Sequence, residues 1–336
     1  MPAARNSGWR FPVAPPMTST DSTTTVVATA FGGPEALSVV DRAIAAPGAG
    51  QVSVAVRAVG TNPIDYKLYS GAFGHDPGQR PIALGSEAAG VVTAVDDGAE
   101  GPAGPIHPGD EVVLYPIEGA YASQVVVPVS SVVPKPSTLT FEEASGLVLT
   151  GSTAVHALTV TGVGAGDTVV VHGASGGVGL MAVQLAVDAG TRVIATAGKS
   201  RHDYLRTLGA EPVAYGDGLI ERIRALAPGG VDAAIDAAGT DEALDTSIAL
   251  VADRNRITTI AGFQRGFELG IKVLGGVPGG DPGTEVRAAA RLELVRLAQA
   301  GKLKVLVAAT YPLAEAAAAH RALASGHTHG KIVLVP

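Results

Sequence analysis

Residues 169–186 read VVVHGASGGVGLMAVQLA, and no other stretch of the chain says more about its architecture. A run of valines enters a glycine-rich turn, and an apolar run that suits a helix leaves it. Residues 174–179 follow the dinucleotide-binding pattern G-x-G-x-x-G, with alanine in the first place. The N–H groups that open a helix hold a phosphate well. The stretch therefore predicts a strand, a nucleotide loop and a helix; a tight turn without a ligand is the alternative.

The residues of this loop have separate roles in such a motif. Gly176 and Gly177 let the main chain approach a pyrophosphate, and Gly179 lets the helix pack close to the strand. Ser175 and Val178 flank the two central glycines. We expect Ser175, Gly176, Gly177 and Val178 to contact the nucleotide.

Strand-like and helix-like segments alternate from residue 166 to residue 262. The strand-like segments are GDTVVVHG, TRVIATA, EPVAYG, VDAAIDAAG and NRITTIAG. Repeated βα units imply a parallel, doubly wound sheet, so the predicted fold class is α/β. This context is what makes the glycine loop informative.

The regions on either side of this alternating segment have different residue patterns. Residues 25–135 hold short valine-rich segments separated by Gly, Pro and Asp, which predicts a small β-barrel or sandwich. Thr140, followed by two glutamates, is the predicted N-cap of a long apolar helix. Beyond residue 284 the pattern is helix, strand, helix, strand. We expect residues 1–24 to be a disordered tail.

Composition excludes several classes of function. The 336 residues suffice for two domains. A net charge of −7 without a Lys/Arg cluster argues against nucleic acid as a partner. The chain has no cysteine, hence neither disulfides nor a thiolate zinc site, which is compatible with the cytoplasm. No segment reads as a signal peptide or a membrane span. We expect a cytoplasmic protein with a small-molecule substrate.

The second strand of the alternating region bears on the choice of cofactor. For NAD, an acidic residue about 20 residues past the loop would accept a hydrogen bond from the ribose 2′-OH. Here the strand ends instead in Gly198-Lys199-Ser200-Arg201, and the first carboxylate is Asp203. Lysine and arginine suit a 2′-phosphate. We therefore predict NADPH (NADP), bound by Gly198, Lys199 and Arg201; a solvated basic helix start is the alternative.

Several motifs, in this order, give the chain a resemblance to the medium-chain dehydrogenase/reductase superfamily and its zinc-free quinone oxidoreductase branch. They are AVGTNPIDYKLYSG (58–71), LGSEAAGVV (84–92), PGDEVV (108–113), LTFEEASGLVLTGSTAVHAL (139–158), the glycine loop, and SGHTHGKIVL (325–334). The resemblance implies a GroES-like, β-rich catalytic domain (25–146 and 284–336) with an inserted Rossmann NADP-binding domain (147–283). The active site then lies between the two.

The resemblance also indicates which positions would bind zinc in zinc-dependent relatives. They hold Asn62, Ser86 and Leu149 here, which do not form a zinc set. We predict no metal. The remaining metal-like pairings, which we interpret as solvated loops, are His327 with His329 and His75 with Asp76.

By the same resemblance, further residues belong to the cofactor site. Asn62 and Thr150 would lie near the nicotinamide and its ribose, and Tyr215 near the adenosine phosphate. The other predicted contacts are Gly239 and the carboxamide-facing main chain of Ala261, Gly262 and Phe263. Two alternatives remain: Asn62 and Asp65 simply cap the turn around Pro63, and the Thr150 hydroxyl is an N-cap or lies within a helix.

The proton donor is the part of the site that departs from the family pattern. Hydride addition to an enone gives an enolate, which needs an electrophile at oxygen and a proton at carbon. Lys67 and Phe73 stand where quinone-branch relatives often carry tyrosines. The tyrosines present, Tyr66 and Tyr69, are differently placed. We predict Lys67 as proton donor or oxyanion partner, with Tyr66, Asn62 and Thr150 as the other catalytic candidates; a surface lysine is the alternative. Glu87, in an apolar run, needs a structural partner such as an arginine or main-chain amides.

These patterns predict an NADPH-dependent oxidoreductase that reduces the activated C=C bond of an enone or quinone by metal-free hydride transfer. A carbonyl or imine reductase on the same fold is one alternative. A non-redox cyclase, isomerase or binding protein that retains the nucleotide is another. By analogy with the family, we expect a homodimer joined through FELGIKVLGG (267–276), an apolar segment at a sheet edge.

Overall fold

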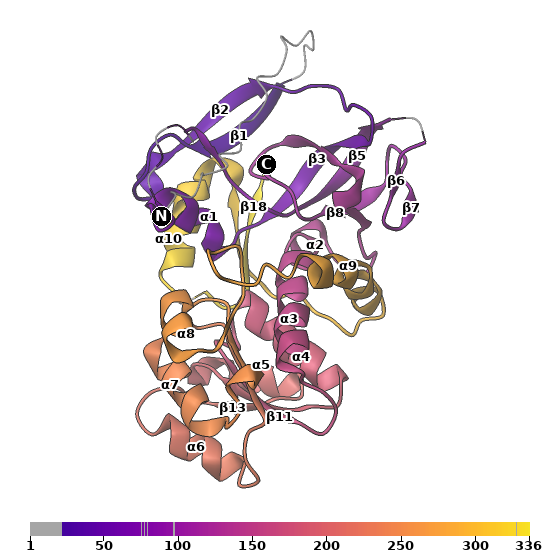
Figure 1. The fold of residues 1–336 in the computed structure, drawn as a ribbon. Helices are drawn as coiled ribbons and strands as arrows, with labels where there is room; N and C mark the ends of the chain where they lie inside the picture. Colours follow the sequence, from indigo (N-terminus) through magenta and orange to yellow (C-terminus); the bar gives the residue numbers. More distant parts are fainter. Residues whose placement is uncertain (1–21, 75, 77, 79, 97, 327) are drawn as a thin grey trace, which may run out of the picture.

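Two parts with sheets of different character build the molecule in the computed structural model, which describes residues 22–74, 76, 78, 80–96, 98–326 and 328–336. In Figure 1, a part rich in antiparallel strands lies above a part in which helices surround a parallel sheet. We call them the β-rich part (22–134 and 307–335) and the parallel-sheet part (168–273). The fold is α/β, as predicted.

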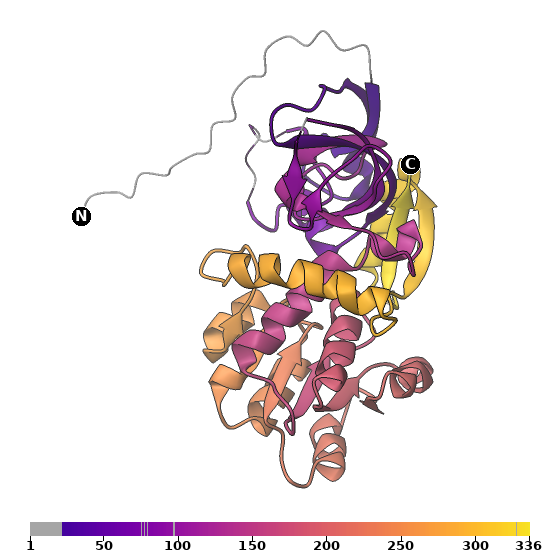
Figure 2. The same cartoon turned by 90° about the vertical axis from the view of Figure 1, so that its right-hand side faces the viewer.

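The β-rich part is completed by the end of the chain. Its largest sheet has the order β10-β8-β5-β3-β18-β17, with β9 also paired to β3. Strand β18 runs antiparallel to β3 and parallel to β17, and Figure 2 shows these yellow strands beside the purple ones. The bounds are β3 (Gln51–Gly60), β5 (Ala88–Val95), β8 (Glu111–Leu114), β9 (Gln124–Pro128), β10 (Val132–Pro134), β17 (Val307–Pro312) and β18 (Lys331–Val335).

A smaller sheet, β2-β1-β4, adds to this part. Its strands are β1 (Ser22–Ala28), β2 (Leu37–Ala43) and β4 (Ile82–Ala83), and β6 (Glu100–Gly101) pairs with β7 (Gly104–Pro105) nearby in sequence. Strand β1 begins within the predicted tail, so residues 22–24 are ordered strand. The rest of that predicted tail lies outside the described residues.

The parallel-sheet part has the strand order β13-β12-β11-β14-β15-β16, and every pairing in it is parallel. The five predicted strands are all confirmed. The chain order along the sheet reverses between β11 and β14, and ligands of such sheets bind at that point. The bounds are β11 (Thr168–His172), β12 (Arg192–Thr196), β13 (Glu211–Val213), β14 (Ala233–Asp236), β15 (Ile257–Thr259) and β16 (Lys272–Val273), the last at one edge.

Ten α-helices are present in the described ranges. They are α1 (Pro63–Ser70), α2 (Phe141–Ala144), α3 (Val148–Thr161), α4 (Gly177–Asp188), α5 (His202–Thr207), α6 (Leu219–Leu226), α7 (Asp241–Leu250), α8 (Phe263–Leu269), α9 (Thr284–Gln299) and α10 (Ala316–Ala324). Thr140 caps α2, because its hydroxyl accepts from the Glu143 N–H and the Glu143 carboxylate accepts from the Thr140 N–H. The single long helix predicted here is instead two, α2 and α3.

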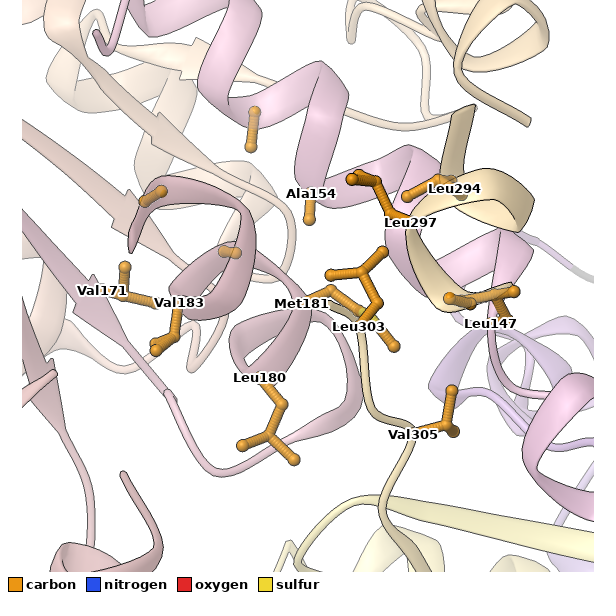
Figure 3. Close-up of a cluster of buried hydrophobic side chains, with 14 of the residues drawn as sticks. Leu147, Ala154, Val171, Leu180, Met181, Val183, Leu294, Leu297, Leu303 and Val305 are labelled. Atoms are coloured by element: carbon orange, nitrogen blue, oxygen red, sulfur yellow. The ribbon is translucent and has the colours of Figure 1, made fainter. Parts of the chain in front are cut away.

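Helix α9 joins the two parts. Figure 3 shows Leu294 and Leu297 of α9 beside Ala154 of α3 and Met181 of α4, within one buried apolar cluster. On the other side, the buried Arg291 donates to two main-chain carbonyl oxygens of the β-rich part. No helix of the described residues combines the length and the apolar character that crossing a membrane requires.

The close approach of α4 to its strand gives a test of the fold. A Cβ added at Gly179 would lie 2.2 Å from the carbonyl oxygen of Gly173 and 2.7 Å from Ala174 Cα. Gly179→Ala should therefore lower the free energy of unfolding by about 1–3 kcal/mol in urea titrations. Gly164→Ala is the control, because a Cβ there meets no atom within 4 Å. Equal stability of the two variants would contradict this packing.

Candidate functional site

The predicted nucleotide-binding residues gather at the carboxyl ends of the parallel strands, which we call the cofactor edge of the sheet. Each group follows the carboxyl end of a different strand, where ligands of open parallel sheets bind. The groups are Ser175, Gly176, Gly177 and Val178 after β11; Gly198, Lys199 and Arg201 after β12; Tyr215 after β13; Gly239 after β14; and Ala261, Gly262 and Phe263 after β15.

Main-chain contacts pack the loops of this edge against one another. Gly173 has φ +67°, and a Cβ there would lie 2.9 Å from the carbonyl carbon of Ala237 in the loop after β14. Gly239 has φ +72°, and its added Cβ would lie 2.8 Å from Ala261 Cβ in the loop after β15. The loops after β11, β14 and β15 thus form one continuous surface across the switch point. The sequence predicts a pyrophosphate at the glycine loop and the start of α4, where a helix offers its N–H groups to an anion.

A buried lysine connects the glycine loop to the β-rich part. The Lys331 ammonium donates to the Thr61 carbonyl oxygen (2.8 Å), Asn62 Oδ1 (2.7 Å) and Glu87 Oε1 (2.8 Å). Its stem passes Gly177, since a Cβ added there would lie 3.2 Å from Lys331 Cδ. Lys331 is 4% exposed and Glu87 is fully buried. All three ammonium protons have acceptors, which a buried charge requires.

Glu87 and Asn62 complete this polar centre. Glu87 accepts from Lys331, from Asn62 Nδ2 (3.0 Å) and from the N–H of Leu149 (3.2 Å). The expected structural partner of Glu87 therefore exists, and it is a lysine with amide groups rather than an arginine. Both Asn62 Nδ2 protons have acceptors, Glu87 and the Gly60 carbonyl. Toward a ligand, Asn62 retains only the acceptor capacity of Oδ1.

The contacts of this polar centre bear on whether Asn62, Ser86 and Leu149, at the positions that would bind zinc in zinc-dependent relatives, fit a zinc ion. Asn62 is hydrogen-bonded to an ammonium and a carboxylate, and Leu149 offers only its main chain. A cation already neutralises Glu87, and zinc requires nitrogen, sulfur or carboxylate ligands that these positions lack. The described ranges contain no group of three His, Cys, Asp or Glu side chains that could hold a metal. Of the metal-like pairings predicted above, His75 and His327 lie outside the described residues.

A hydrogen-bonded chain of buried groups fixes the start of α1. Asp65 Oδ2 accepts from the Asn62 N–H (2.8 Å) and the Tyr121 hydroxyl (3.1 Å). His320 Nε2 lies 2.7 Å from the Tyr121 oxygen, and His320 Nδ1 lies 2.7 Å from the Tyr69 oxygen. Since Tyr121 donates to Asp65, His320 donates through Nε2 and accepts from Tyr69. Asp65 therefore caps the turn that starts α1. His320 of α10 supports this cap through its hydrogen bond to Tyr121.

Burial perturbs the titration of this chain. It lowers the pKa of His320 to about 4, consistent with the neutral ring that the hydrogen bonds require. It also raises the pKa of Asp65 to about 7, against the opposing effect of its hydrogen bonds and of Lys331. One oxygen of Asp65, Oδ1, has no hydrogen-bond partner within the described part of the chain. These hydrogen-bonded side chains position Asn62 and helix α1, which carries Lys67.

Of the predicted catalytic side chains, Lys67 contacts the segment that follows β15. Its ammonium lies 5.2 Å from the centroid of the Phe263 ring, a cation–π contact between α1 and the loop after β15. Burial lowers the pKa of Lys67. Tyr66 packs against the core of the β-rich part, and burial raises its pKa. The Thr150 hydroxyl donates to the Gly146 carbonyl (2.6 Å), so it is internal to the helix, while its methyl group faces Gly177.

The predicted 2′-phosphate residues also lie together. Lys199 and Arg201 form a single helical turn directly after β12. A Cβ added at Gly198 would lie 3.8 Å from the Tyr215 hydroxyl, and Tyr215 is 61% exposed. The buried Nε of Arg201 finds no hydrogen-bond partner in the part of the chain that the structure describes. This corner of the sheet edge is cationic, and its exposed phenol is available to a ligand.

Comparison with known proteins agrees with this architecture. Residues 48–137 match the alcohol dehydrogenase GroES-like domain, and residues 208–334 match the family model described as zinc-binding dehydrogenase. A quinone oxidoreductase of Pseudomonas aeruginosa is 34% identical over 328 residues, which are 91% of this chain and 98% of that protein. The chain belongs to the medium-chain dehydrogenase/reductase superfamily. Within this superfamily it falls in the quinone oxidoreductase-like branch.

Other members of the superfamily differ in length and cofactor. The spectinabilin polyketide synthase system protein NorB of Streptomyces orinoci is 34% identical over 85% of this chain, which spans only 13% of NorB. An NAD-dependent alcohol dehydrogenase structure has a TM-score of 0.81 at 31% identity, covering 93% of this chain and 99% of that one. A mycobacterial protein complexed with NADPH has a TM-score of 0.79 at 31% identity, covering 94% and 100%.

Sequence reasoning missed three side chains of the site: Lys331, Asp236 and Thr259. Lys331 follows a glycine with positive φ and opens a valine-rich strand, where a lysine signals a buried partner. Asp236 ends the apolar strand β14 in the same way. Lys331 and Asp236 each stand at one end of an otherwise apolar strand, and this was the available signal. Thr259 follows another threonine in β15 and carries no such signal.

Proposed function

We propose that this chain is an NADPH-dependent oxidoreductase that reduces the C=C bond of an enone or quinone without a metal. The observation that carries the proposal is the position of Lys67, a half-buried amine that extends from α1 to the Phe263 ring. It has no ion-pair partner within the residues described, so its proton is available to a substrate. Support for the nucleotide comes from the alignment of the predicted contacts along one sheet edge and from the relative complexed with NADPH.

The proposed chemistry divides between cofactor and chain. When bound, NADPH would supply the hydride that reduces the enone at its β-carbon, and the loops after β11, β12 and β15 would hold the nucleotide. The Lys67 ammonium donates one proton to the resulting enolate, becomes the neutral amine and is reprotonated from solvent. A lowered pKa suits this donor role, because general acids work best near the operating pH. Asn62 accepts a hydrogen bond from the nicotinamide ribose, the role that its free acceptor capacity allows. Lys331 and Glu87 keep Asn62 in place.

The preference for NADPH rests on Lys199 and Arg201. Lys199→Ala combined with Arg201→Ala should raise the KM for NADPH roughly 10- to 100-fold, since charge-assisted hydrogen bonds to the 2′-phosphate are lost. The KM for NADH should change little, because NADH lacks that group. Arg206→Ala is the control: it pairs with Asp203 on the neighbouring helix turn, away from the cofactor edge. An equal loss with both cofactors would show that the cofactor prediction is wrong.

The proton-donor role of Lys67 has its own test. Lys67→Met should lower kcat for enone reduction at least about a hundredfold, because the general acid is removed. In the unsubstituted enzyme, kcat should fall as pH rises through the lowered pKa of Lys67, and this limb should vanish in the variant. Lys135→Met is a matched control, since Lys135 lies 5.0 Å from the Phe141 ring centroid, remote from the cofactor edge. Unchanged kcat in Lys67→Met would refute the role.

A further inference from the structure

Two fully buried polar side chains end neighbouring strands at the cofactor edge. Asp236 is the last residue of β14 and Thr259 the last of β15, and the two are opposite in register. Thr259 Oγ1 donates to Asp236 Oδ2 over 2.6 Å. Neither was predicted from the sequence, and the chemistry proposed above does not use them.

The pair organises the loop that follows each strand. Asp236 also accepts from the N–H groups of Ala238 (2.9 Å) and Gly239 (2.9 Å), which fixes the loop after β14. Thr259 Oγ1 accepts from the N–H groups of Ala261 (3.2 Å) and Gly262 (2.9 Å), which fixes the loop after β15. The hydroxyl proton therefore points at Asp236, and both lone pairs of the hydroxyl hold amides.

This arrangement dictates which main-chain groups the second loop can offer a ligand. The N–H of Ile260 donates to the main-chain oxygen of Asp236, so three successive N–H groups, from Ile260 to Gly262, turn toward the sheet. In a planar trans peptide the C=O points opposite to the N–H. The carbonyl oxygens of Ile260 and Ala261 consequently face away from Thr259. At these two peptides, the loop presents acceptors.

We propose that Thr259, directed by Asp236, is a positioning residue that aims the carbonyl oxygens of Ile260 and Ala261 at the carboxamide NH₂ of the nicotinamide. The inference rests on the nicotinamide cofactor of the proposed function and adds the group that orients its reactive ring. The adenosine half of the cofactor meets the loops after β12 and β13, which Thr259 does not contact. Loss of the hydroxyl should thus weaken only the nicotinamide half.

The test compares two ligands, NADPH and 2′-phospho-ADP-ribose, which lacks the nicotinamide. Thr259→Val should raise the Kd for NADPH about tenfold, because two buried amides lose their acceptor. Its Kd for 2′-phospho-ADP-ribose should stay unchanged in calorimetry. Thr259→Ser, which retains the hydroxyl, should bind both ligands like the unsubstituted protein. So should Thr258→Val, since the equally buried Thr258 donates instead to the Lys272 carbonyl.

Asp236→Asn provides a second variant should Thr259→Val fail to fold. Its amide would donate to Thr259 Oγ1, removing an acceptor site from the loop, and should weaken NADPH binding selectively in the same way. Equal losses for both ligands, or none for NADPH, would overturn the positioning role. Failure of the unsubstituted protein to bind either ligand would instead refute the proposed function itself.

Discussion

The structure depends on one buried cation. The Lys331 ammonium compensates the charge of the buried Glu87 carboxylate. Each of the three ammonium protons has an acceptor. Breaking a pair of this kind by removing one partner strands the other charge away from water. Because Lys331 opens β18, this contact also explains why the end of the chain returns to the first sheet. The stem of the same lysine lies beside Gly177. Lys331 therefore fixes the position of Asn62 relative to the glycine loop.

From this centre the two sides of the site acquire different characters. The parallel-sheet side is rigid, since backbone contacts at Gly173 and Gly239 join its loops and buried side chains hold their amides. The opposite side presents α1, whose start is fixed through Asp65 and whose Lys67 reaches the Phe263 ring. Loops with fixed main-chain groups on one side and the Lys67 amine on the other suit hydride transfer followed by protonation.

Much of the fold could be predicted because local patterns specify it. The strands around the glycine loop, the Thr140 cap and the helix beyond residue 284 are each written in a few consecutive residues. The partner of Glu87 could not be predicted, because Lys331 is 244 positions away and only the tertiary fold brings them together. Thr150 was predicted to lie near the nicotinamide and its ribose; its methyl group faces Gly177, and its hydroxyl is engaged within its own helix.

The most direct test of the central claim is NADPH oxidation by a panel of quinones and enones after exhaustive chelation, with the metal content of the same sample measured by mass spectrometry. Because the Lys331 ammonium already neutralises Glu87 and the described residues place no zinc-ligand set around Asn62, turnover should be the same with chelator, without it and with added zinc. Loss of turnover on chelation that zinc restores would contradict the account.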